Sequence, residues 1–174
     1  MPSEVQAIVE SKAEKKERRR VLILGLGNIL LRDEGFGVHV AQQLAQTELP
    51  DYVEVIDGGT SSLDVLLGEE GVKKLIVVDV LKAGGEPGAI YRLKVDSDHI
   101  KRLKELFGPH QRATVSLHQI GLIDALAAAE KLGNAPQEIV IIGIEPKEIE
   151  WKLELTDVLK KQVTQVINLV LEEV

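Results

Sequence analysis

Five short aliphatic runs recur along the chain with longer amphipathic segments between them, and this alternation restricts the fold more than any other feature. Each run is dominated by Val, Ile and Leu, a pattern typical of a β-strand that is buried on both faces. The runs are residues 21–24, 53–56, 75–78, 89–93 and 139–142. Buried strands that alternate with helices form a parallel sheet covered on both sides. The sequence therefore predicts a single three-layer α/β domain with a mostly parallel, twisted sheet of about five strands.

Three segments show the periodicity of amphipathic helices. The first begins near Phe36 and repeats apolar residues every four positions. The second is expected from about Leu117 to Leu132, and the third from Asp157 to Glu173, with Thr156 as its N-cap. The predicted inward positions are Ile120, Ile123, Leu126 and Ala127 in the second helix, and Val158, Val163, Val166, Ile167 and Val170 in the third.

Charge divides the chain into two parts. Residues 1–20 hold six Lys or Arg against four Glu, although the whole chain carries a formal net charge of −7. We interpret residues 1–20 as a flexible, charged N-terminal arm. Residues 21–174 contain no Pro- or Gly-rich linker, low-complexity tract or internal repeat, so they are expected to form one domain.

Composition excludes several classes of function. An acidic body with only 2 Phe, 1 Trp and 2 Tyr argues against nucleic-acid binding. The first twenty residues lack the apolar region of a signal peptide, and the longest nearly apolar run, residues 21–31, is too short to span a membrane. By elimination we expect a cytoplasmic protein. We further expect a monomer or a weak oligomer. Cysteine is absent, so any metal ligand or nucleophile must be an oxygen or a nitrogen.

The loop after the first predicted strand, residues 25–37, begins like a dinucleotide-binding fingerprint. However, Leu30 occupies the place of the third glycine, and Asp33 and Glu34 would repel a pyrophosphate. Nucleotide binding is therefore disfavoured. We interpret Asp33 as a cap of the following helix, which leaves Glu34 free to face a crevice.

Three further polar residues follow predicted strands or open a helix. Asp57 precedes two glycines, so it either turns the chain or belongs to a loop that closes on a substrate. Asp79 follows a buried run, where a carboxylate needs a partner or a function. Ser116 and Gln119 have the spacing of a capping box, which places His118 in the first turn of a helix. His118 is then either a surface residue or a metal ligand or base.

Ligands of open α/β sheets bind at the carboxyl ends of the strands, where Glu34, Asp79 and His118 are expected to meet. One imidazole and two carboxylates suit a borderline divalent ion such as nickel or zinc. The HExxH spacing of zincins does not occur. His39 lies off the helical face of Glu34, and we leave it out of this predicted site.

Four segments in this order resemble the hydrogenase maturation endopeptidase family: residues 25–38, 57–60, 77–80 and 116–122. The similarity runs from about residue 21 to the end of the chain. It implies an endopeptidase that removes a C-terminal extension from the large-subunit precursor of a nickel–iron hydrogenase after nickel insertion. By the same resemblance, Glu34, Asp79 and His118 fall on the positions that contact nickel.

The resemblance further implies that nickel arrives in the precursor, held by the cysteines of that precursor, and is absent from the isolated enzyme. The chemistry of the cut stays open. Either nickel polarises the scissile carbonyl, or a carboxylate activates water as in an aspartyl protease, with Asp57 or Asp79 as the catalytic residue. The alternative from another class is a non-catalytic nickel-sensing or chaperone module for the same precursor.

Overall fold

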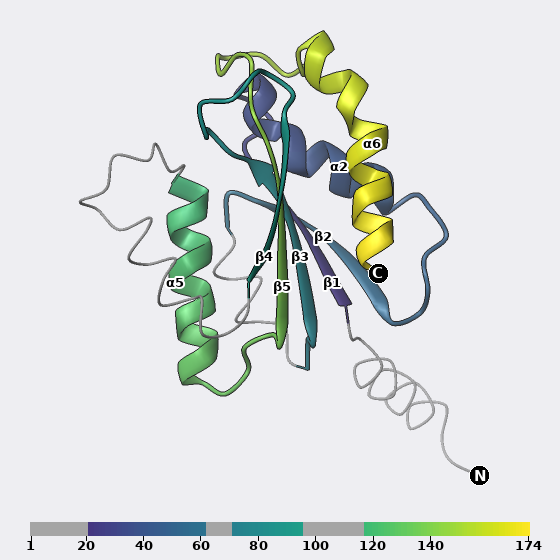
Figure 1. The fold of residues 1–174 in the computed structure, drawn as a ribbon, viewed down its shortest axis with the longest axis vertical. Helices are drawn as coiled ribbons and strands as arrows, with labels where there is room; N and C mark the ends of the chain where they lie inside the picture. The colour runs from purple at the N-terminus through teal and green to yellow at the C-terminus, as the bar shows by residue number, and fades with distance from the viewer. Residues whose placement is uncertain (1–20, 62–70, 96–116) are drawn as a thin grey trace, which may run out of the picture.

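The computed structural model describes residues 21–61, 71–95 and 117–174, and the charged arm predicted for residues 1–20 lies outside these ranges. All five predicted strands and all three predicted helices form, together with one short 3-10 helix (Figure 1). The elements are β1 (Val21–Leu26), η1 (Arg32–Gly35), α2 (Phe36–Leu44), β2 (Val53–Gly59), β3 (Lys74–Val80), β4 (Ile90–Val95), α5 (Leu117–Lys131), β5 (Glu138–Ile144) and α6 (Asp157–Glu173).

The strands form one sheet in the order β2-β1-β3-β5-β4. Strands β2, β1, β3 and β5 are parallel, whereas β4 pairs antiparallel with β5. The prediction of a mostly parallel sheet is confirmed. The four parallel strands all end at the same side of the sheet, which is at the upper end in Figure 1 and which we call the carboxyl edge.

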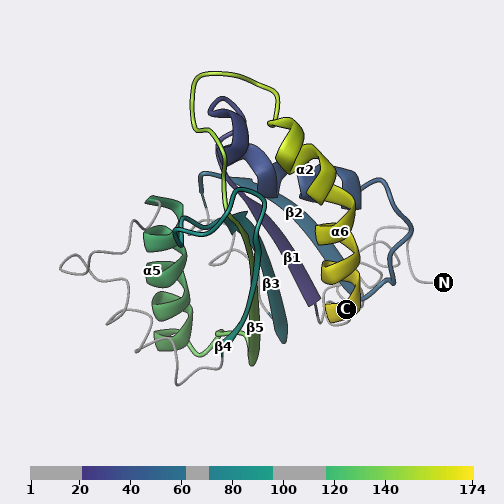
Figure 2. The ribbon, with the colours of Figure 1, turned by 45° about the horizontal axis from the view of Figure 1, so that its top comes forward.

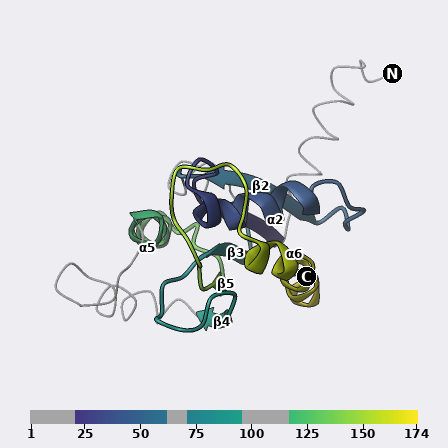
Figure 3. The ribbon, with the colours of Figure 1, turned by 90° about the horizontal axis from the view of Figure 1, so that it is seen from above.

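Helices cover both faces of the sheet, as predicted. Helices α2 and α6 lie on one face and α5 lies on the other (Figure 3). Because side chains alternate along a strand, Ile76 and Val78 of β3 pack toward α2 and α6, whereas Leu75 and Val77 pack toward α5. This alternation decides which face each polar residue of β3 can reach.

The buried stripe of α6 differs slightly from the predicted one. Val163, Val166 and Val170 are buried as predicted, but the innermost position near the start of the helix is Leu159 rather than Val158, which is only partly buried. Ile167 is partly buried as well. In α5, Ile123 and Leu126 are buried and Ala127 is partly buried, whereas the side chain of Ile120 lies outside the described part of the structure.

Thr156 occupies the predicted N-cap position of α6 and has the extended backbone of a cap, but its side chain does not cap the helix. Its hydroxyl donates a hydrogen bond to Asp33 instead, at 3.0 Å. Among the described helices, none is both long enough and apolar enough to cross a membrane.

A partly buried ion-pair cluster fixes the last turn of α6 to strands β3 and β4. The carboxylate of Glu173 accepts a hydrogen bond from Lys74 of β3 at 2.9 Å and pairs with Arg92 of β4. Burial alone would raise the pKa of Glu173, but the hydrogen bonds and positive charges of Lys74 and Arg92 outweigh it and hold the pKa below its usual range. The cluster therefore anchors α6 electrostatically as well as by its apolar stripe.

Replacing Glu173 tests this anchor. We expect Glu173→Ala to lower the free energy of unfolding by about 2 kcal/mol, because it removes the buried carboxylate that Lys74 and Arg92 share, although Lys74 keeps its ion pair with Glu138 at 3.0 Å. Urea denaturation measures the change. The matched control is Glu172→Ala, which removes a neighbouring carboxylate that is exposed and lies 3.9 Å from Arg92; it should cost less than about 0.5 kcal/mol. Equal losses in the two variants would contradict the anchor.

Candidate functional site at the carboxyl edge

Two loops from opposite ends of the described chain lie side by side at the carboxyl edge. They are the β1–α2 loop, residues 27–35, and the β5–α6 loop, residues 145–156 (Figure 2). Their backbones pair: the amide of Arg32 donates to the carbonyl of Lys152 at 2.7 Å, and the amide of Lys152 donates to the carbonyl of Leu30 at 3.0 Å. The two loops therefore form one backbone unit.

Asp33 ties this unit together and is not the helix cap that the sequence predicted. Helix α2 has no side-chain cap, and Asp33 is fully buried. Its Oδ2 accepts hydrogen bonds from the amides of Lys147 and Glu148 at 2.9 and 3.0 Å. The amide and the hydroxyl of Thr156 donate the other two, at 2.8 and 3.0 Å. The prediction was wrong because all four donors lie in a segment more than 110 residues further along the chain.

Arg32 makes a second connection between the same loops. Its guanidinium lies 2.8 Å from a carboxylate oxygen of Glu148 and also pairs with Glu150. Its φ of 54° is in the left-handed region, which costs energy for a residue other than glycine. The surrounding ion pairs and backbone hydrogen bonds hold it there.

The glycines that imitate a nucleotide fingerprint serve close packing. Gly27 has a φ of 138°, and a Cβ at this position would lie 1.9 Å from the carbonyl oxygen of Glu34. A Cβ on Gly25 would lie 2.2 Å from the carbonyl oxygen of Gly37 in α2. Glycine is needed at these positions because η1 and α2 approach the sheet too closely to leave room for a side chain. These contacts also fix the backbone of Glu34 against the end of β1.

Asp79 lies within β3 and is 2% exposed. Val78 and Val80 on either side of it face α2 and α6, so Asp79 projects toward the face that α5 covers. One carboxylate oxygen accepts a hydrogen bond from the amide of Val80 at 2.7 Å, and the other has no hydrogen-bond partner among the described residues. Such an orphaned buried oxygen is costly and requires an explanation.

Electrostatics connect Asp79 to Glu34. Burial raises the pKa of Asp79 to about 7, the amide of Val80 opposes the rise, and the negative charge of Glu34 adds to it. Glu34 is half-buried in η1. The structure therefore brings two of the three predicted metal ligands within electrostatic range of one another.

Asp57 is on the other side of the sheet. It is exposed at the end of β2, and it accepts hydrogen bonds from the Gln42 side chain of α2 at 3.0 Å and from the amide of Gly59 at 3.1 Å. Asp57 is in register with Gly25, which is in register with Val78, so Asp57 and Asp79 project to opposite faces. The two residues do not form the facing carboxylate pair typical of aspartyl proteases.

His118 is the second residue of α5. The last turn of α5 leads into β5 at the opposite edge of the sheet, and a helix of 15 residues rises about 22 Å, so its first turn lies toward the carboxyl edge (Figure 1). The topology thus places His118 on the α5 side of the sheet, the side to which Asp79 projects. The side chain of His118 lies outside the described part of the structure. Among the side chains that are described, no three His, Asp or Glu residues are grouped closely enough to hold a metal ion.

Glu145 is a buried carboxylate at this edge that the sequence prediction missed. It directly follows β5 and accepts hydrogen bonds from the amides of Ala83 and Gly85 at 2.9 and 3.2 Å, and from the hydroxyl of Tyr91 at 2.9 Å. Burial alone would raise the pKa of Glu145, but these donors outweigh it and lower the pKa. A carboxylate directly after a buried strand was the available signal, the same one that identified Asp79.

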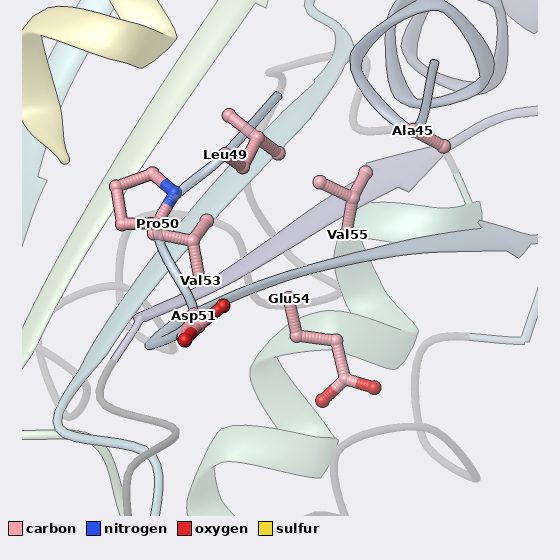
Figure 4. A pocket seen from close by; sticks show the side chains of 7 residues that line it. All are labelled: Ala45, Leu49, Pro50, Asp51, Val53, Glu54 and Val55. Carbon is pink, nitrogen blue, oxygen red and sulfur yellow. The ribbon is translucent and has the colours of Figure 1, made fainter. Parts of the chain in front are cut away.

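One hollow, of about 390 Å³, lies far from these residues (Figure 4). Its lining comes from the loop after α2 and from the beginning of β2, where Val53 pairs with the first residue of β1. It is therefore at the amino edge of the sheet, and none of the predicted site residues lines it. The lining residues are Ala45, Leu49, Pro50, Asp51, Val53, Glu54 and Val55.

Comparison with known proteins shows that this chain is similar to a class of small α/β proteases. The profile of the hydrogenase maturation proteases matches residues 38–173. The hydrogenase 2 maturation protease of Escherichia coli K12 is 33% identical over 154 residues, which cover 87% of this chain and 88% of that protein. The hydrogenase expression/formation protein HupD of Bradyrhizobium diazoefficiens is 38% identical over 153 residues, covering 86% and 75%.

Solved structures of hydrogenase maturation endopeptidases have the same fold as this chain. The hydrogenase maturating endopeptidase HybD from E. coli superimposes with a TM-score of 0.76 at 32% identity, covering 88% of this chain and 91% of that one. The chain belongs to the hydrogenase maturation protease family.

The burial of Asp79 predicts a specific dependence of stability on pH. Because its pKa is raised in the folded state, the unfolded chain loses the proton first, and the free energy of unfolding falls as pH rises from about 4 to about 7. Asp79→Asn removes this loss. We expect the stability of the variant relative to wild type to increase by on the order of 3 kcal/mol between pH 4 and pH 8, measured by urea denaturation. A difference that does not change with pH would contradict the burial of an ionisable carboxylate.

Proposed function

We propose that this protein cleaves the C-terminal extension from the large-subunit precursor of a nickel–iron hydrogenase, and that it recognises the nickel carried by that precursor. The observation that supports the proposal most strongly is the buried carboxylate of Asp79 at the carboxyl edge, which has one oxygen without a described partner and lies within electrostatic range of half-buried Glu34. Membership of a protease family supports the cleavage, and the name of the hydrogenase 2 maturation protease of E. coli supports the class of substrate.

The orphaned oxygen of Asp79 fits a cation. A divalent ion would supply the missing partner and offset the repulsion between Asp79 and Glu34. His118 would add a nitrogen ligand from the face to which Asp79 projects. In this proposal the nickel belongs to the substrate and is held mainly by the precursor. Glu34, Asp79 and His118 would therefore bind only the coordination positions of the nickel ion that the precursor leaves vacant. A precursor without nickel lacks this contact and is left uncut.

Peptide hydrolysis requires a water molecule that attacks the carbonyl carbon, a group that accepts a proton from this water, and a proton for the leaving amine. Of the two candidate carboxylates we assign the proton transfer to Asp79, because both oxygens of Asp57 are hydrogen-bonded to Gln42 and Gly59 on the other face. In this route the unpartnered oxygen of Asp79 takes the proton from the attacking water and passes it to the leaving amine, while Glu34 and His118 contact the nickel. Asp57 then serves to hold the end of β2. Nickel polarisation of the scissile carbonyl is the second route, and it uses the same three ligands.

The test is the mass of the precursor after incubation with this protein, with and without nickel. We expect the intact mass to fall by the mass of the C-terminal extension only when the precursor is nickel-loaded. Glu34→Gln, Asp79→Asn and His118→Ala should each reduce kcat/KM at least 100-fold. Glu48→Gln, which changes an exposed carboxylate in the loop after α2, is the control and should cleave at the wild-type rate.

Two results would overturn the proposal. If wild-type protein binds the loaded precursor and leaves its mass unchanged, the protein is a non-catalytic nickel-sensing or chaperone module. If the three variants cleave as fast as wild type, the assignment of the site is wrong.

A further inference from the structure

Four large apolar side chains are exposed at the carboxyl edge and come from the two loops that pair there. They are Ile29 and Leu30 of the β1–α2 loop and Trp151 and Leu153 of the β5–α6 loop, and we call them the apolar rim. The chain has a single Trp, and it is 80% exposed here. An exposed Trp contributes little apolar burial to the stability of the domain. A cluster of large exposed apolar side chains is instead typical of a binding surface.

The rim is held on a rigid support. The backbones of its two loops are paired through Leu30, Arg32 and Lys152, and the buried carboxylate of Asp33 fixes both loops from beneath. Apolar side chains on a preorganised backbone lose little conformational entropy when a partner binds. Trp is one of the residue types enriched among the side chains that contribute most of the binding energy at protein interfaces.

The rim is continuous with the candidate site. Ile29 and Leu30 belong to the loop that carries Glu34, and Gly35 packs so closely on this loop that a Cβ would lie 2.8 Å from the Cα of Ile29. A partner that brings a ligand to Glu34 therefore meets the rim as well. This continuity is our reason for choosing the substrate, rather than a second copy of the chain, as the occupant.

A cavity of about 470 Å³ borders the rim at Leu153. Lys160 also lines this cavity. A folded protein can bind such a surface by placing apolar side chains on the rim and a further side chain in the hollow.

We propose that the apolar rim is the docking surface for the folded body of the large-subunit precursor. The rim binds the precursor next to the site that receives the nickel and the scissile segment. This inference rests on the proposed function. It assigns substrate affinity to Trp151 and Leu153, two residues that take no part in the chemistry.

The chain offers a matched control for the test. Leu153 is 64% exposed on the rim, and Leu132 is 66% exposed just after α5, at the amino edge. With nickel-loaded precursor, we expect Trp151→Ala and the double variant Trp151→Ala/Leu153→Ala to raise Kd, measured by calorimetry, at least tenfold, and to raise KM rather than lower kcat. Leu132→Ala should leave both constants at the wild-type values. Unchanged thermal midpoints confirm that the exposed substitutions leave the fold intact.

The outcomes separate this inference from the proposed function. Rim variants that bind within twofold of wild type and cleave normally would overturn the rim while the proposed function stands. A wild-type protein that binds through Trp151 but never shortens the precursor would support the rim and overturn the cleavage. A wild-type dimer that Trp151→Ala converts to a monomer in sedimentation would overturn the inference, because the rim would then bind a second copy.

Discussion

The buried carboxylate of Asp33 is the interaction on which the carboxyl edge depends. An isolated carboxylate in the interior is costly, and here four donors from the β5–α6 loop offset that cost. The bonds fasten a loop near the start of the domain to one near its end. Glu34 follows Asp33 directly, and the apolar rim sits on the same two loops. The position of the site and the position of the proposed docking surface therefore share one cause.

Buried carboxylates occur four times in the described residues, and the way each one is satisfied separates structure from function. Asp33 and Glu145 accept donors from neighbouring loops, and Glu173 is paired with Lys74 and Arg92. Asp79 is the exception, because one of its buried oxygens has no partner there. A buried acid whose hydrogen bonds are complete needs no ligand to explain it, whereas Asp79 does. This contrast, and not burial alone, singles out Asp79.

Local patterns predicted the fold well because they depend on neighbours in sequence. The aliphatic runs and the helical periodicity placed the five strands and the three α-helices of the described residues, although not the 3-10 helix η1. They also placed Asp79 in β3 and His118 at the start of α5. Asp33 was misassigned because its hydrogen-bond donors are distant in the chain. Its position just before α2 suggested a helix cap instead. The separation of Asp57 from Asp79 depends on the register across β1, which no local pattern specifies. Glu145, like Asp79, comes at the end of a buried aliphatic run, so the rule that selected Asp79 would also have selected Glu145.

Amide hydrogen exchange in wild type and in Asp33→Asn tests the central role of Asp33 most directly. Asparagine keeps one acceptor oxygen but puts an amino group where the other oxygen accepts three bonds. We expect the amides of Lys147 and Glu148 to exchange at least tenfold faster in the variant, while the amides of β3 and α5 keep their protection. Unchanged exchange at residues 147 and 148, or an equal loss of protection throughout the domain, would contradict it.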